Sequence, residues 1–215
     1  MTRGLALACA VALGTLSPSL AAQARWQVSL GAAGGGETVR SRTDTLRERL
    51  SGTVFTGEAL LTRRRLALRA RYGQGRVTGN LRTVMARDVA EGEALLGYTV
   101  RPWLTLWLGP HARSYGTTFG DQRWLFWSAR ASARGSLFPG RVESVVELWQ
   151  AFAGNVSRPA SSAAGRGAEA GLQLRLASRP LWGRLAYRIE QGRVGAARRE
   201  TVEAVTLTVG YLPLR

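Results

Sequence analysis

The last regular stretch of the chain, 201-TVEAVTLTVGYL-212, decides the fold class. Val205, Leu207, Val209 and Tyr211 fall on one face of an extended chain, and the smaller or more polar residues between them fall on the other. A period of two is typical of a β-strand whose two faces meet different environments. The sequence therefore predicts a strand at this position.

The same alternation recurs along most of the chain before this strand. Leu181–Ile189 and Ala168–Leu176 repeat it directly. The other expected strands cover residues 26–36, 51–62, 66–76, 88–100, 103–115, 123–137 and 142–154. We predict an all-β domain of ten antiparallel strands. Merging two of the early runs would give eight strands, and a misread loop would give twelve.

The predicted strands are long, and the links between them alternate in length. A tilted strand needs roughly 9 to 11 residues to cross a bilayer, whereas strands in globular domains usually have about 5 or 6. Short links such as Arg101-Pro102 and Pro139-Gly140 alternate with polar stretches such as Glu37–Arg49 and Asn155–Gly167. The other long links are Arg76–Arg87, Gly116–Gln122 and Arg193–Arg199. An up-and-down meander with five longer loops outside and both termini on the periplasmic side is therefore expected.

Residues 1–24 have the pattern of a secretory signal peptide. A basic start precedes the apolar run Leu5–Leu16, and Ala22-Gln23-Ala24 forms a small-x-small cleavage site. Cleavage would leave residues 25–215 as the mature domain, without the single cysteine, Cys9. We therefore expect no disulfide, no cysteine nucleophile, no metal site and no cofactor.

The charge of the chain is strongly basic but widely scattered. All 30 basic residues are arginines, and with 14 acidic residues they give a formal net charge of +16. Nucleic-acid binders gather such residues on one surface or in a tail, so no nucleic-acid partner is expected. The run Gly31–Gly36 lacks the Walker lysine and a following helical pattern. It predicts a flexible strand-to-loop segment rather than a phosphate-binding loop.

The charged side chains indicate which face of each strand lies inside a barrel. Arg69 and Arg71 lie opposite Leu66 and Leu68, and the same separation recurs on later strands. A membrane barrel turns its apolar face to lipid and its polar face to the lumen. Glu203 has the parity of the apolar face, but it lies near a strand end, where a charged side chain that faces the membrane costs little free energy. The predicted lumen-facing charged network consists of Glu58, Arg69, Arg71, Glu91, Glu93, His111, Arg113, Arg130, Arg134, Glu143, Glu147, Glu169, Arg175, Arg184, Arg188 and Glu190.

Aromatic residues predict two belts at the lipid–water boundaries. The belt at the short-link end contains Trp26, Tyr98, Trp103 and Tyr211, and the belt toward the loop end contains Phe55, Tyr72, Trp124, Trp127 and Phe152. Trp103 and Trp124 have interior parity, so their place in the belts requires a β-bulge. Open strand edges in hydrocarbon would leave backbone groups unsatisfied, so the first strand is expected to pair with the tenth.

Over essentially all of residues 25–215, the chain resembles the small bacterial outer-membrane β-barrel proteins, OmpA-like or omptin-like in architecture only. The segment Thr208-Val209-Gly210-Tyr211-Leu212 is similar to the C-terminal assembly signal of that class, although Pro213-Leu214-Arg215 replaces the usual terminal aromatic residue. The resemblance implies location in the bacterial outer membrane and contact with its lipid and lipopolysaccharide. It also implies insertion by the barrel-assembly machinery through the C-terminal strand, and we expect a monomer.

The sequence allows three functional interpretations. The favoured one is a structural or surface-interaction role, in which paired charges fill a narrow interior and the loops, including Arg40–Arg49, contact lipopolysaccharide or another surface ligand. The second is a small anion-preferring pore, because arginine is in excess. The third is an outer-membrane hydrolase that uses His111. The spacing of His111-Ala112-Arg113-Ser114 puts Ser114 on the opposite strand face, and omptin-like acidic and Asp-His motifs are absent, so we expect no enzyme.

Overall fold

The chain folds into one closed antiparallel β-barrel. The computed structural model describes residues 26–43, 47–79, 86–117, 120–157, 160–176, 179–195 and 198–212. The predicted signal peptide (residues 1–24) and the last three residues lie outside these ranges. Every strand pairs with its neighbours in sequence, and β1 pairs with β10 to close the barrel. The predicted fold class, strand count and closure are confirmed.

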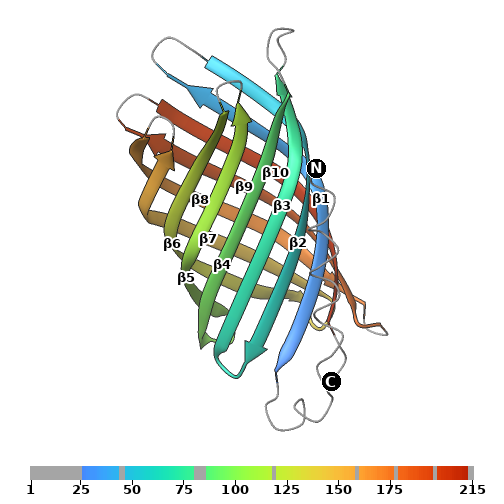
Figure 1. The fold of residues 1–215 in the computed structure, drawn as a ribbon. Coiled ribbons are helices and arrows are strands. Elements are labelled where there is room, and N and C mark those ends of the chain that lie inside the picture. The colour runs from blue at the N-terminus through green and yellow to red at the C-terminus, as the bar shows by residue number, and fades with distance from the viewer. Residues whose placement is uncertain are drawn as a thin grey trace, which may run out of the picture.

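The strands are tilted across the barrel, as closure of a sheet requires (Figure 1). Their bounds are β1 Gln27–Arg42, β2 Arg47–Arg63, β3 Leu66–Gly79, β4 Arg87–Arg101, β5 Leu104–Thr117, β6 Gly120–Phe138, β7 Val142–Ser157, β8 Ala160–Arg175, β9 Leu181–Val194 and β10 Arg198–Tyr211. The end at which β1 begins and β10 ends is called the periplasmic end, following the predicted orientation, and the other is called the extracellular end. Within the described residues, no helix is long and apolar enough to cross a membrane.

The strands are longer than predicted, and the prediction of long loops at one end is wrong for most of the connections. The strands contain 14 to 19 residues. The extracellular connections are residues 43–46, 80–86, 118–119, 158–159 and 195–197, and the periplasmic ones are 64–65, 102–103, 139–141 and 176–180. Only the connection 80–86 is clearly longer than those at the other end. Polar residues beyond the bilayer need no apolar alternation to pair their backbones, so the sequence pattern fades where the strands continue into water.

The glycine-rich run of β1 also differs from the prediction. Gly31–Gly36 is continuous strand, paired with β10 on one side and β2 on the other. A Cβ atom at Gly35 would collide with the backbone carbonyl oxygen of Val205 on the neighbouring strand. Glycine is therefore required here by the close approach of two strands, and the segment is not a strand-to-loop transition.

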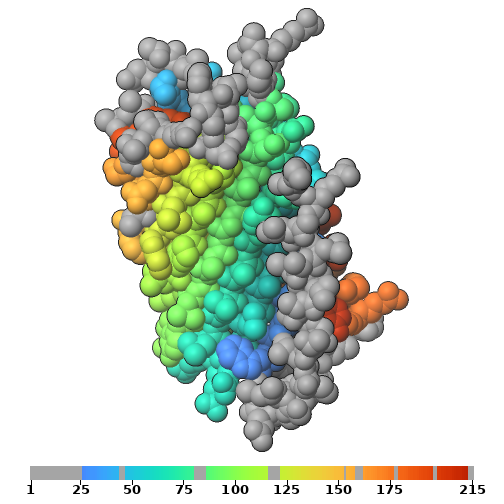
Figure 2. Space-filling model, viewed as in Figure 1, coloured from blue at the N-terminus to red at the C-terminus, as the bar shows by residue number. Residues whose placement is uncertain are grey.

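The outer wall is apolar and continuous. Leucine, valine and aromatic side chains cover it; Leu207, for example, is 60% exposed. On the same strands, most of the charged side chains point into the barrel. Figure 2 shows the wall closely packed over its green to yellow part, without a gap between strands. The outward-facing Glu203 is paired with Arg40, whose Nη2 lies 2.9 Å from Glu203 Oε2. This inside-out distribution suits a barrel whose outer face meets lipid.

Candidate functional site

Toward the extracellular end, the interior is closed by buried apolar side chains. We call this cluster the apolar plug; its residues are Val39, Leu50, Val77, Val89, Tyr115, Trp124, Phe126, Ala151, Val156, Val194 and Val202, with the partly buried Ala163 packed against them. These residues come from all ten strands. The plug therefore spans the whole cross-section of the barrel.

The prediction that Trp124 joins an outer aromatic belt is wrong. Its side chain is 2% exposed and packs at 5.7 Å from Phe126, ring centroid to centroid. The inward parity of β6 runs unbroken through this position, and the nearest β-bulge, at Trp127/Ser128, does not turn Trp124 outward. The interior apolar layer keeps Trp124 inside, whereas Trp127 on the opposite face is 46% exposed.

The remaining predicted belt residues are exposed on the outside or at its edge. They are Trp26, Phe55, Tyr72, Tyr98, Trp103, Trp127, Phe152 and Tyr211. Trp103 lies in the turn between β4 and β5, after a register shift between Thr99 and Arg101, so strand parity does not determine its direction.

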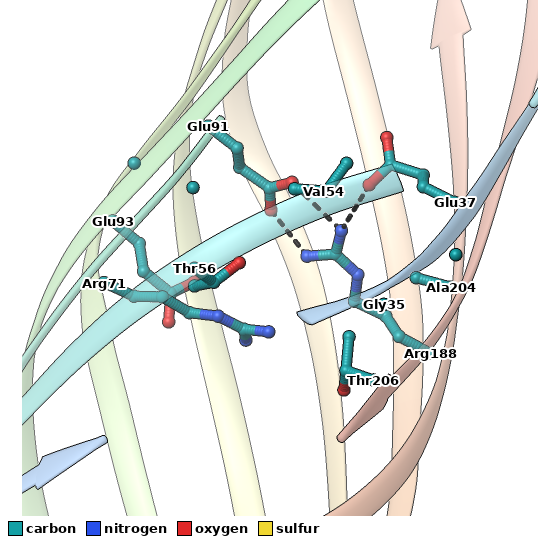
Figure 3. Close-up of a pocket in the computed structure, with 13 residues that line it drawn as sticks. Gly35, Glu37, Val54, Thr56, Arg71, Glu91, Glu93, Arg188, Ala204 and Thr206 are labelled. Atoms are coloured by element: carbon teal, nitrogen blue, oxygen red, sulfur yellow. Dashed lines mark hydrogen bonds and ion pairs between the residues drawn. The ribbon is translucent and has the colours of Figure 1, made fainter. Parts of the chain in front are cut away.

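A first group of buried or partly buried ionisable side chains, the upper cluster, consists of Glu37, Glu91, His111, Arg113, Arg188 and Glu190. Arg188 binds Glu91 at 2.6 Å and Glu37 at 3.3 Å (Figure 3). Arg113 lies 3.1 Å from Glu190 and 3.5 Å from Glu91. The paired residues lie on β1, β4, β5 and β9, so these ion pairs connect strands across the lumen.

His111 belongs to this cluster. Its Nε2 lies 2.9 Å from Glu91 Oε1, and its ring faces Phe126 at 6.0 Å. The side chain is 3% exposed, and Ser114 falls on the opposite parity of β5. This enclosed setting suits a residue that positions Glu91 within the network.

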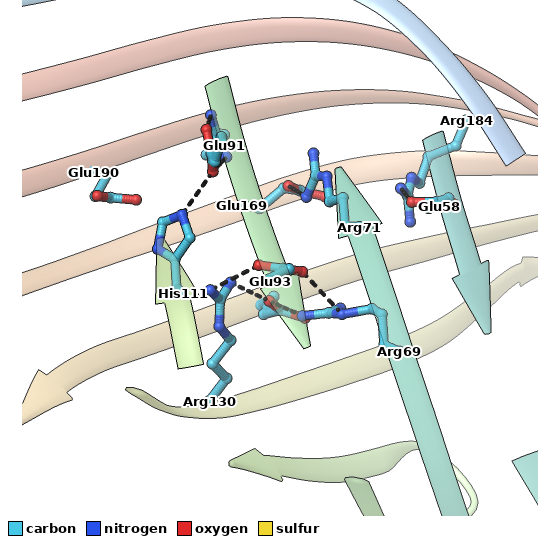
Figure 4. A network of polar contacts seen from close by, with 12 residues as sticks. Glu58, Arg69, Arg71, Glu91, Glu93, His111, Arg130, Glu169, Arg184 and Glu190 are labelled. Carbon is cyan, nitrogen blue, oxygen red and sulfur yellow. Dashed lines mark hydrogen bonds and ion pairs between the residues drawn. The ribbon is translucent and has the colours of Figure 1, made fainter. Parts of the chain in front are cut away.

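A second group, the lower cluster, alternates two arginines with two glutamates. Arg69 donates two hydrogen bonds to Glu147, at 2.7 and 2.8 Å, and its Nε lies 3.2 Å from Glu93. Arg130 reaches Glu93 at 2.8 Å, as Figure 4 shows. It also lies 3.2 Å from Glu147. Each carboxylate therefore meets both guanidinium groups, which balances charge inside a poorly hydrated space.

Two interior tryptophans support the lower cluster. The guanidinium of Arg69 lies 4.8 Å from the ring centroid of Trp107, and that of Arg130 lies 5.0 Å from Trp149. Such cation–π contacts favour a desolvated guanidinium over an aromatic face. Trp107 also donates a hydrogen bond to Ser132 at 2.8 Å. The sequence prediction included neither tryptophan in the interior network, although both share parity with its charged residues.

The structure places all sixteen predicted network residues on the lumen side. Further pairs join Arg71 to Glu169 at 3.6 Å, Arg184 to Glu58 at 2.9 Å and Arg175 to Glu143 at 3.1 Å. Arg134 is exposed at the periplasmic mouth, and no described carboxylate pairs with it.

The sequence prediction missed some charged residues of the interior because they fell in or beside predicted loops. They are the pairs Arg87–Glu48 and Arg198–Glu200 and the buried Glu37. Glu37, Glu48 and Glu200 each lie two residues from Val39, Leu50 or Val202 and share its inward face, and this shared parity is the signal that could have placed them.

Below the lower cluster the interior widens into a cavity of about 560 Å³. Its lining runs from Arg69 and Glu147 down to Gly140, Pro180 and Leu212 at the periplasmic end. From the extracellular side inward, the lumen therefore consists of the apolar plug with the pairs Arg87–Glu48 and Arg198–Glu200 beside it, two charge clusters and a cavity. Among the described residues, no group of three or more His, Cys, Asp or Glu side chains could hold a metal ion.

Comparison with known proteins shows the fold but assigns no family. No family model and no curated protein sequence matches the chain. An outer membrane channel from Pseudomonas putida F1 is similar in structure, with a TM-score of 0.51 and 10% identity over 87% of this chain and 96% of that one. The outer membrane protease OmpT from Escherichia coli gives a TM-score of 0.48 and 10% identity over 87% and 96%. The chain thus has the fold of the bacterial outer-membrane β-barrels, with buried Arg/Glu salt bridges inside.

Proposed function

We propose that the protein is a non-conducting outer-membrane barrel with a structural and surface-interaction role. The observation that carries this proposal is the apolar plug, to which all ten strands contribute side chains. An ion crossing it would lose most of its hydration among tightly packed apolar side chains, which is costly in a low-dielectric interior.

The charge clusters below the plug favour the same role. Arg188, Arg113, Arg69 and Arg130 each bind at least two carboxylate groups, so their positive charge is largely compensated. A pore that selects anions needs uncompensated positive charge along an open path. The interior arginines therefore support a paired structural core more strongly than an anion pathway.

We expect the protein to be electrically silent in planar lipid bilayers. Folded protein, identified by heat-modifiable gel migration, is added to the bilayer and current is recorded under an applied voltage in a KCl gradient. An outer-membrane porin in the same bilayer provides the positive control. A stable anion-selective conductance that changes in Arg130→Ala would overturn the closed-barrel proposal.

A row of arginines on the extracellular rim supports contact with lipopolysaccharide. Arg47, Arg42, Arg199 and Arg193 are cross-strand neighbours on β2, β1, β10 and β9, and all four are exposed with outward parity. No described carboxylate pairs with them. Like charges directly opposite each other are destabilising, so a bound anion offsets their repulsion. The phosphate groups of lipopolysaccharide have the charge and membrane position to do this.

Arg42→Gln/Arg199→Gln is expected to weaken lipopolysaccharide binding by at least about tenfold, because each charge-assisted hydrogen bond contributes about 1.5–3 kcal/mol. Binding is measured by titrating purified lipopolysaccharide against protein in phosphatidylcholine nanodiscs. Arg65→Gln/Arg101→Gln at the periplasmic end removes the same charge and provides the control. Unchanged binding in the rim variant, or an equal loss in both variants, would contradict the assignment.

A further inference from the structure

The cavity at the periplasmic end is blind. It has a volume of about 560 Å³, which lies within the range of pockets that bind small molecules. The lower cluster forms its roof through Arg69 and Glu147, and the upper cluster and the plug lie beyond that roof. A molecule that enters from the periplasmic end therefore has no path onward through the barrel.

The cavity has a surplus of positive charge. Its lining contains five arginines and three glutamates: Arg69, Arg134, Arg175, Arg179, Arg184, Glu58, Glu147 and Glu169. Arg69, Arg175 and Arg184 each have a carboxylate partner, at 2.7, 3.1 and 2.9 Å respectively. No described carboxylate pairs with Arg134 or Arg179, and both side chains are exposed. Two guanidinium groups on the cavity lining are thus available to a ligand.

Much of the remaining wall is apolar, with Ser29, Thr62, Ser132, Gln27 and Gln173 as its neutral polar groups. Trp182 lies beneath Arg184, with 5.6 Å between the guanidinium carbon and the ring centroid, and its Nε1 donates to Ser29 Oγ at 3.2 Å. Leu60 and Leu181 add aliphatic surface to the same lining. Apolar walls with a few available charged groups are typical of small-molecule sites, where the charges orient the ligand. Guanidinium groups suit phosphate and carboxylate oxygens because they offer paired N–H donors.

We propose that this cavity binds a small polyanion, carrying at least two phosphate or carboxylate groups, that enters from the periplasm. Arg134 and Arg179 bind the anionic groups, and Trp182 and Leu60 contact the remainder of the ligand. The site is separate from the extracellular arginine row and needs no conduction through the plug.

The test uses the full barrel in phosphatidylcholine nanodiscs, which leave both ends accessible. Inorganic pyrophosphate and citrate are titrated separately by calorimetry, so the two arms distinguish phosphate from carboxylate recognition. Saturable 1:1 binding of at least one probe is expected. Arg134→Gln/Arg179→Gln should weaken it by at least about tenfold, because two charge-assisted contacts are lost. Since neither arginine has an ion-pair partner among the described residues, this variant should fold, which heat-modifiable migration verifies.

Arg65→Gln/Arg101→Gln is the matched control. These arginines lie at the same end of the barrel, outside the cavity lining, and their replacement removes the same charge. The control should retain the wild-type affinity within about twofold, because screening weakens the effect of exposed charges outside the cavity. Absence of saturable binding of both probes to the wild type would overturn the proposal. An equal loss of affinity in both variants would also overturn it, because the effect would then reflect net charge alone.

Discussion

Replacement of Arg130 by methionine is expected to lower the free energy of unfolding by about 3–5 kcal/mol. Methionine retains much of the side-chain volume and removes the charge. Glu93 and Glu147 would then share the single guanidinium of Arg69, from which they lie 3.2 and 2.7 Å away. Two buried carboxylates with one partner leave a negative charge uncompensated, which is the main cost of breaking a buried pair.

The measurement is reversible urea unfolding of the barrel in lipid vesicles, followed by tryptophan fluorescence. Arg76→Met is the control, because Arg76 pairs with Asp88 at 2.9 Å on the outer surface, where their side chains are 68% and 75% exposed. An exposed pair contributes only about 0–1 kcal/mol. Equal losses in the two variants would show that the lower cluster does not behave as a buried, coupled network.

Replacement of Trp124 by alanine is expected to cost about 3–5 kcal/mol, the range for removing a large aromatic side chain from a packed core. Trp124 is the largest side chain of the apolar plug and contacts Phe126. Trp124→Phe should retain most of the stability, because a second aromatic ring fills much of the same space. The Nε1 of Trp124 is buried and has no hydrogen-bond partner among the described residues, so phenylalanine loses no such bond.

Urea unfolding measures both Trp124 variants, and quenching by brominated lipids tests where the side chain lies. Trp127 on the lipid face should be quenched, so Trp127→Phe should reduce the quenchable fluorescence. Trp124→Phe should leave the quenchable fluorescence unchanged. A loss of quenchable signal in Trp124→Phe, or a cost below about 1 kcal/mol for Trp124→Ala, would argue against the plug.

The difference between the predicted and observed strands has one physical origin. Within the bilayer, lipid selects apolar residues at every second position, and Val205, Leu207 and Val209 carry that signal plainly. Toward the extracellular end both faces of the strand tolerate polar residues. Arg42 pairs with Arg47 here, and Ser157 pairs with Ala160. Lipid-facing apolar residues do not mark these ends of the strands, so the sequence did not predict that the strands extend this far. Backbone hydrogen bonding continues there regardless of side-chain polarity.

The sequence by itself determined the all-β class, the closure and the face on which each of the sixteen network residues lies, and it favoured ten strands over eight or twelve. It could do so because side-chain direction alternates strictly along a strand, and lipid on one side makes the two faces chemically different. Only the tertiary structure decided that Arg188 meets Glu91, that Trp124 lies inside and that the lumen is plugged above and open below. These features depend on the register and stagger of strands distant in sequence, which bring side chains to the same height in the barrel.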